Sequence, residues 1–242
     1  MTEIAVAVVD AETPGNIGTI ARAMRNFGLS NLLLIDPPAL DPDGEAYGFA
    51  GKAREDVLPN HEVITFDELV EEYHTIGFTA ITNESGNKHV RYPFSTPAEL
   101  PERLATTGGP IALVFGRERV GLTNDELARI DEICSIPAAA DYPTLNLGQA
   151  ATIALYELSG LVLPETQLPD RDADRATPEE LAGFFEHAAT FLEELNYPEE
   201  KRGKTLRLIR RVFGRADPTG RELKTLRGVM RRASRLAERR QP

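Results

Sequence analysis

The sequence contains few of the residues that build disulfides and metal centres. It has one cysteine, Cys134, and four histidines among 242 residues. A single cysteine excludes an internal disulfide and most cysteine-based metal sites. Because the histidines are scattered along the chain without a pair at metal-ligand spacing, we expect no bound metal.

Long apolar runs and a charged N-terminal leader are also missing. No stretch approaches the roughly 18 apolar residues that span a bilayer. The first residues, MTEIAV, lack the positively charged region that opens a signal peptide. We therefore expect a cytoplasmic protein with no membrane partner.

Positive charge is scarce over most of the chain and concentrated near its C-terminus. Residues 201–240 hold 15 of the 27 basic and 3 of the 38 acidic residues, which gives a net charge of +12 there and −23 elsewhere. A basic segment attached to an acidic body favours an appendage that binds a polyanion. A solvated, arginine-rich helix is the alternative interpretation of the same composition.

The first 36 residues predict a strand, a glycine-bearing turn, a helix and a second strand. The β-branched run IAVAVVD (4–10) ends at a turn, which is typical of a buried strand. The turn that follows offers two glycines, free backbone amides and Asn16, with Arg22 further along the helix. It matches neither GxGxxG nor a P-loop, so a dinucleotide or nucleoside triphosphate site has little support. An ordinary α/β turn is the alternative.

Strand-like and helix-like patterns alternate over residues 1–163 and predict an α/β fold with a largely parallel sheet covered on both faces. Residues 164–178 are rich in proline and aspartate and are expected to form a linker. Residues 179–242 are expected to form a basic bundle of amphipathic helices. Further expected elements of the first domain are strands over 32–36, 62–66, 78–82, 111–116 and 132–138, and helices over 67–77, 97–108, 123–130 and 147–163.

Two later segments repeat the pattern of a strand followed by a polar, glycine-bearing turn. In LVFGRERVGLTNDEL (113–127) the turn carries Gly116 and Glu118. In IPAAADYPTLNLGQAATIALYEL (136–158) a proline-bearing loop carries Asn146 just before a long helical pattern. Ligands in open α/β sheets bind beyond the carboxyl ends of strands, so we expect these loops and the first turn to gather at one cleft.

The three segments together resemble the SPOUT superfamily of S-adenosylmethionine-dependent RNA methyltransferases, in its ribose 2′-O-methylating branch. The matching motifs are GNIGTIAR (15–22), FGRERVGL (115–122) and IP...TLNLGQAATIALYE (136–157), which occur in the family's order and spacing. Within that branch the chain resembles the TrmJ-type tRNA methyltransferases. These methylate the ribose of the first nucleotide of the anticodon loop, position 32, and carry a C-terminal helical extension.

This resemblance implies a fold, a cofactor and partners. SPOUT domains contain a deep trefoil knot, an exception to the general rule against knots, which would involve about residues 112–160 here. The family binds S-adenosyl-L-methionine in loops of the knot, acts on RNA without a metal and forms a homodimer. The helix that starts near Leu147 would lie at the dimer interface, although its apolar residues also fit plain core packing.

The resemblance also assigns roles to residues at the motif positions. Arg22 is expected to contact RNA and to supply charge and orientation, because arginine is an awkward base. Many relatives carry a serine at the position of Thr144, which leaves a catalytic role for its hydroxyl less certain. The expected catalytic residues are Arg22, Asn16, Glu118, Thr144 and Asn146. The expected cofactor-binding residues are Thr82, Asn83, Gly116, Ile136, Thr144, Leu145 and Asn146. The expected RNA-binding residues are Arg22, Arg25, Arg54, Arg207, Arg210, Arg211, Arg231 and Arg232.

Three other functions fit the same motifs. A ribosomal RNA 2′-O-methyltransferase would share the whole catalytic unit. A non-catalytic RNA-binding protein on this scaffold would bind tRNA without cofactor, and the motif residues argue against it. Base methylation has weaker support. Preference for cytidine or for either pyrimidine depends on contacts to the base edge and is left open.

Overall fold

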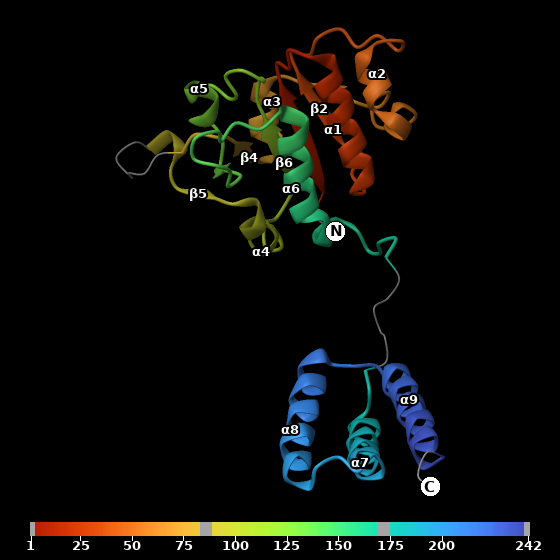
Figure 1. Cartoon of the computed structure of the whole chain (residues 1–242). Helices are drawn as coiled ribbons and strands as arrows, with labels where there is room; N and C mark the ends of the chain where they lie inside the picture. Colours follow the sequence, from red (N-terminus) through yellow and green to blue (C-terminus); the bar gives the residue numbers. More distant parts are fainter. Residues whose placement is uncertain (1–2, 83–88, 169–174, 240–242) are drawn as a thin grey trace. The chain divides into compact units, whose positions relative to one another are not determined.

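The computed structural model describes residues 3–82, 89–168 and 175–239. The chain folds into two compact units, Met1–Thr166 and Gln167–Pro242 (Figure 1). The first unit combines a sheet with helices, and the second is helical. None of the helices in the described ranges has the length and apolar character that crossing a bilayer requires.

The first unit is built on a parallel sheet, which confirms the predicted α/β class. In the described residues it has seven strands in the order β3-β2-β1-β6-β4-β7-β5, and all pairs are parallel. The central strands β1 and β6 are buried along their whole length, as expected of a sheet with both faces covered. The strands are β1 (Ile4–Val9), β2 (Leu32–Ile35), β3 (Glu62–Val63), β4 (His74–Phe78), β5 (Phe94–Ser95), β6 (Ile111–Phe115) and β7 (Glu132–Cys134).

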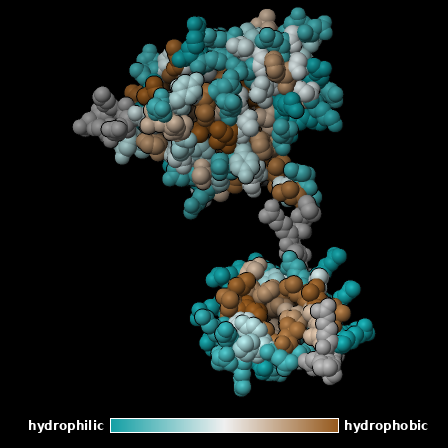
Figure 2. Space-filling model, viewed as in Figure 1, coloured by the Kyte–Doolittle hydropathy of each residue, from teal (hydrophilic) through white to brown (hydrophobic). Residues whose placement is uncertain are grey.

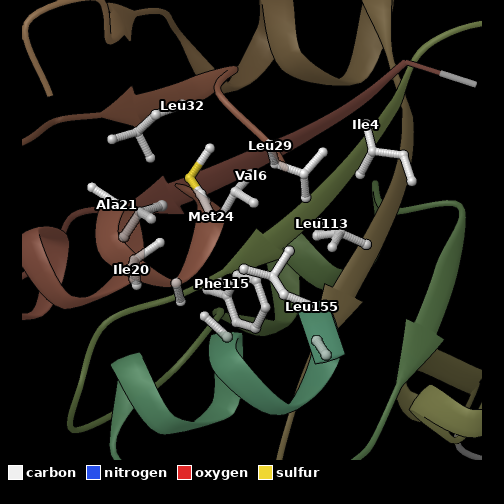
Figure 3. Close-up of a cluster of buried hydrophobic side chains, with 14 of the residues drawn as sticks. Ile4, Val6, Ile20, Ala21, Met24, Leu29, Leu32, Leu113, Phe115 and Leu155 are labelled. Atoms are coloured by element: carbon white, nitrogen blue, oxygen red, sulfur yellow. The ribbon is translucent and has the colours of Figure 1, made fainter. Parts of the chain in front are cut away.

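Helices cover both faces of this sheet. On one face, α1 and α6 pack together over β1 and β6, and Figure 3 shows Met24 and Leu155 directed into this core. On the other face, Leu69 of α3 and Leu127 of α5 complete a smaller apolar cluster. The helices are α1 (Pro14–Asn26), α2 (Glu45–Phe49), α3 (Phe66–Glu72), α4 (Leu100–Leu104), α5 (Asn124–Leu127) and α6 (Leu147–Val162), with short 3-10 turns η1 (Gly51–Arg54), η2 (His89–Arg91) and η3 (Pro97–Glu99).

One glycine of the first motif is required by packing. A Cβ on Gly18 would lie 2.0 Å from the carbonyl oxygen of Ala46 in α2. Only glycine therefore allows α1 and α2 to approach this closely. The predicted turn at residues 14–18 is instead the start of α1, which begins at Pro14. The contact sets how closely this end of α1 packs against α2.

The predicted helix over 67–77 and strand over 78–82 are wrong. Helix α3 ends at Glu72, and β4 occupies His74–Phe78. The apolar residues of this stretch fit helical spacing, but β4 pairs with both β6 and β7 along the sheet. These backbone hydrogen bonds and the burial of both faces override the local pattern. Strands β3 and β7 are also shorter than predicted. Strand β3 stops early because Thr65 already caps α3, and β7 ends at Cys134.

The second unit consists of three helices, α7 (Pro178–Glu194), α8 (Glu199–Ala216) and α9 (Gly220–Glu238), with α7 packed against both others. Its buried apolar side chains are few: Phe184, Ala188, Leu192 and Leu223. Helix α8 has no fully buried residue. In Figure 2 hydrophilic residues surround the apolar ones that gather on the visible face of this unit.

Candidate functional site

A cleft opens where β4, β6 and β7 end, at the carboxyl edge of the sheet. It encloses a cavity of about 140 Å³. Two of the three predicted loops line it: residues 116–121 after β6 and residues 143–145 before α6. Apolar walls come from Phe78, Phe115 and Ile136, and the rings of Phe78 and Phe115 stack with centroids 4.5 Å apart.

The first loop joins the second through the carboxylate of Glu118. Its Oε1 accepts hydrogen bonds from the Nδ2 of Asn16 at 2.7 Å and from the backbone amide of Thr13 at 2.9 Å. Its Oε2 accepts a hydrogen bond from the backbone amide of Glu12 at 2.7 Å. One carboxylate on the loop after β6 therefore holds the turn that precedes α1.

These hydrogen bonds also set the ionisation of Glu118. Partial burial raises the pKa of this carboxyl, but the bond from Asn16 and those from the backbone amides of Glu12 and Thr13 outweigh burial. Its pKa consequently lies below the ordinary value for glutamate. Glu118 is ionised at neutral pH and serves as a fixed acceptor.

The third loop enters the same network through Asn146. Its Nδ2 donates to the Oδ1 of Asn16 at 3.0 Å. Its Oδ1 accepts from the backbone amides of Gly148 at 2.9 Å and Gln149 at 3.3 Å, which caps the N-terminus of α6. Asn16 thus connects Glu118 to Asn146, and the three motifs that are far apart in sequence meet in one hydrogen-bonded chain.

Arg117 supports this arrangement, and sequence reasoning missed it. Its Nε donates to Asp10 at 2.7 Å, and its two terminal nitrogens pair with Glu126 at 3.0 and 3.1 Å. These bonds tie the loop after β6 to the end of β1 and to α5. The pair with Glu126 raises the pKa of Arg117 despite partial burial. Its neighbours Asp10 and Glu126 lie 107 and 9 residues away, so the spacing gave no local signal.

Close backbone approach explains the glycine of the second motif. A Cβ on Gly116 would lie 2.3 Å from the carbonyl carbon of Gly121 and from the nitrogen of Leu122. The loop therefore folds back on itself directly behind β6. Only a residue without a side chain permits this wall of the cleft.

The predicted cofactor residues differ in where they lie. Gly116, Ile136, Thr144 and Leu145 line the cleft. Asn146 borders it through the hydrogen-bonded chain described above, and Thr82 is not among the lining residues. Asn83 lies outside the described residues. No hydrogen bond within the described ranges engages the exposed Thr144.

The predicted RNA-binding arginines of the first unit differ in what they contact. Arg22 is exposed beside Gly51 and has no hydrogen bond or ion pair within the described residues. Arg25 forms an ion pair with Asp56, and Arg54 donates to the backbone carbonyl of Tyr47.

In the second unit, Arg210 stacks 4.4 Å from the ring centre of Phe185. The other predicted contacts, Arg207, Arg211, Arg231 and Arg232, are exposed. The described part of the chain holds no cluster of three or more metal-ligating side chains.

The sequence and the fold both match known proteins. Residues 3–156 match the SpoU rRNA Methylase family, and residues 179–242 match the C-terminal domain of the tRNA methyltransferase TrmJ. The chain is 33% identical over 239 residues to the tRNA (cytidine/uridine-2′-O-)-methyltransferase TrmJ of Salmonella typhimurium, covering 95% of this chain and 96% of that protein.

Two solved structures are similar over nearly the whole chain. The crystal structure of TrmJ from Z. mobilis ZM4 has a TM-score of 0.69 at 28% identity and covers 95% of this chain and 98% of that one. A probable methylase family protein from Haemophilus influenzae Rd KW20 has a TM-score of 0.60 at 31% identity, with coverage of 99% and 98%. The chain therefore belongs to the SpoU rRNA methylase family, in its TrmJ-type branch, and is an RNA methyltransferase.

Proposed function

We propose that the protein is an S-adenosylmethionine-dependent tRNA ribose 2′-O-methyltransferase. Its target is the first nucleotide of the anticodon loop, position 32, with cytidine or uridine as the base. It works in the cytoplasm as a homodimer. The match of residues 179–242 to the TrmJ C-terminal domain supports tRNA over ribosomal RNA as substrate.

The observation that carries this proposal is the chain of hydrogen bonds from Glu118 through Asn16 to Asn146. It joins the three motifs at the mouth of one cleft, as an active site assembled from three loops requires. A non-catalytic scaffold would have no need for three converging polar side chains, one of which, Glu118, lines the cleft.

The cleft residues fit the proposed cofactor. Stacked Phe78 and Phe115, with Ile136 and Leu145, offer an apolar slot suited to an adenine ring. Residues 116–121 line the cavity in a loop that folds back on itself, which Gly116 permits because it carries no side chain. Thr144 and Leu145 stand at the same wall. When bound there, S-adenosylmethionine supplies a methyl group on a sulfonium, an activated donor that needs no metal.

The chain's own residues have the remaining task of preparing a weak nucleophile. A ribose hydroxyl is a poor acid, so a nearby positive charge that lowers its pKa assists methylation. Arg22 has a guanidinium without a partner in the described residues and is proposed to orient the ribose and stabilise developing negative charge. Asn16, near the start of α1, and Glu118 act by holding the start of α1 against the loop after β6. Thr144 is proposed to hydrogen-bond near the reacting hydroxyl.

We extend the proposal to a trefoil knot and a dimer. Strand β6 lies between β1 and β4, while β7 lies beyond β4. The chain after β7 returns to line the cleft beside residues 116–121 before α6 packs on α1. This return past β6 supports a knot within residues 112–160. Exposed Tyr156 of α6, in edge-to-face contact with Phe27, supports α1 and α6 as the dimer surface.

The proposed domain boundaries place the catalytic domain at 1–163, the linker at 164–178 and the tRNA-binding extension at 179–242. Exposed arginines of α8 and α9 supply the dense positive charge that phosphate contacts require. The rest of the chain offers little positive charge for such contacts, since residues outside 201–240 carry a net charge of −23.

The deciding experiment is mass-spectrometric nucleoside mapping of unmodified tRNA after incubation with the purified protein and S-adenosylmethionine. We expect one new 2′-O-methyl group at position 32, and its base identifies the pyrimidine preference. Methylation of ribosomal RNA but not of tRNA would show that ribosomal RNA is the substrate. Binding of tRNA without methylation of either RNA would favour the non-catalytic alternative.

A further inference from the structure

Three arginines line the cleft, and they differ in what balances their charge. Arg117 is paired with two carboxylates, and Arg119 donates to Glu12 at 2.9 Å. Arg91 has no carboxylate partner anywhere in the described residues. It is therefore the lining guanidinium whose positive charge the described protein leaves uncompensated.

The hydrogen bonds of Arg91 are few, long and directed to neutral acceptors. One terminal nitrogen donates to the hydroxyl of Thr79 at 3.3 Å and to the carbonyl of Ile81 at 3.4 Å. The other donates to the Oδ1 of Asn124 at 3.2 Å. These lengths lie at or beyond the upper end of the usual range. A guanidinium has five N–H donors, and acceptors among the described residues leave part of this capacity of Arg91 unused, including its Nε–H.

The position of Arg91 makes an unbalanced charge costly. The residue belongs to η2, is half-buried and packs beside the loop that follows β4. A cation partly removed from water is stabilised strongly by an anion that reaches it. The neutral partners hold the side chain in the wall of the cleft, where a bound small molecule would contact it.

We propose that Arg91 pairs with the carboxylate of the methionine part of S-adenosylmethionine. This inference rests on the proposed cofactor. The planar guanidinium matches a carboxylate through two parallel hydrogen bonds, which a backbone amide or a lysine cannot reproduce. Arg91 then distinguishes the intact cofactor from analogues that lack the carboxylate, and it also secures the loop after β4 when the cofactor is bound.

Calorimetric titration of the full chain tests this assignment with S-adenosylmethionine and with decarboxylated S-adenosylmethionine. The wild-type protein is expected to bind the intact compound about tenfold more tightly, the ratio typical of one hydrogen bond between charged groups. In Arg91→Met the preference should vanish because only the affinity for the intact compound falls. Arg91→Lys should retain part of the preference, since lysine keeps the positive charge but lacks the two parallel N–H donors of the guanidinium.

Arg119→Met is the matched control, because Arg119 lines the same cleft but is already paired with Glu12. It should leave the ratio of the two affinities unchanged. Affinity of Arg91→Met for tRNA should also equal that of the wild type. Thermal unfolding checks that Arg91→Met is folded, and Arg91→Lys decides the matter if it is not.

Two outcomes overturn the inference while leaving the proposed function standing. An equal loss of affinity for both ligands in Arg91→Met would show that Arg91 only positions the loop after β4. Lost tRNA affinity with an unchanged ligand ratio would assign the charge to an RNA phosphate. If the wild-type protein binds neither compound, the proposed cofactor fails and the inference falls with it.

Discussion

The two units of the chain use arginine differently. In the first unit, the side chains of Arg117 and Arg119 are fixed by specific carboxylates around the cleft. In the second unit, Arg231 and Arg232 project into solvent from a small bundle without an ion pair in the described residues. Paired arginines set the geometry of a site, whereas solvent-facing arginines remain available to a polyanion. This difference supports our proposal that the first unit positions the site and the second unit binds the RNA.

Removing the second unit should have the largest effect, and this effect should fall on tRNA binding. Deletion of residues 170–242 is expected to weaken tRNA binding by on the order of 100-fold, because most phosphate contacts are lost. Cofactor affinity should be unchanged, since every residue that lines the cleft lies in the first unit. Filter binding at several salt concentrations and calorimetry measure the two quantities. Full tRNA affinity in the truncated protein would refute capture by the second unit.

Within the first unit, Arg22 and Arg25 provide a comparison on one helix. Arg22→Ala should lower kcat by about 100-fold, because its charge has no partner within the described residues and is proposed to act on the ribose. Arg25→Ala should have a much smaller effect, since Arg25 is paired with Asp56. Single-turnover methylation rates at saturating tRNA provide the measurement. Similar losses in the two variants would indicate general electrostatic attraction instead of a specific role.

Glu118→Gln should lower the free energy of unfolding of the first unit, by an amount that depends on pH. The folded-state pKa of Glu118 is lowered, so its ionised form stabilises the fold above the ordinary pKa of about 4.3. This contribution is lost as pH falls through the folded-state pKa. At pH 7 the variant should lose about 1–2 kcal/mol of unfolding free energy.

Urea unfolding at pH 7 and at pH 4 measures this difference. The gap between wild type and Glu118→Gln should narrow at the lower pH. Glu71→Gln, an exposed position on α3, should change stability by less than about 0.5 kcal/mol. A gap that is constant with pH would show that packing, rather than charge, accounts for the loss.

The smallest effects are expected from single arginines of α9. Arg231→Ala and Arg232→Ala should each weaken tRNA binding only several-fold and reduce the salt dependence by about one unit of slope. Lys224 of the same helix is paired with Glu180, so Lys224→Ala should change the salt slope less. Equilibrium binding across a salt series provides the test. An unchanged slope for all three would place the phosphate contacts elsewhere.

Helices and strands were predicted correctly from the sequence where the local residue pattern agrees with the tertiary packing. The run at β1 is apolar throughout because both faces are covered, and a short β-branched run before a turn indicates this directly. The stretch from Leu69 to Phe78 was predicted wrongly because the spacing of its apolar residues suits a helix. Its last five residues instead form β4, which pairs with β6 and β7. That pairing depends on strands distant in sequence, which a local pattern does not contain.

The candidate site shows the same limit. The motifs identified Asn16, Glu118 and Asn146, and the structure joins these three directly. Arg91 was not identified, because its proposed role rests on the absence of a carboxylate partner among the described residues, and such an absence is visible only in three dimensions. Arg117 was overlooked for the opposite reason, since its partners come from β1 and α5.

The double role of Asn146 has a consequence for hydrogen exchange. The same side chain caps α6 and donates to Asn16, so fraying at the start of α6 removes the link that holds the first motif to the third. The backbone amides of Gly148 and Gln149 are bonded to this side chain. Their exchange rates with deuterium therefore report whether the three-loop site is assembled. The exchange rates of these two amides can therefore be followed to monitor the assembly of the site without bound substrate.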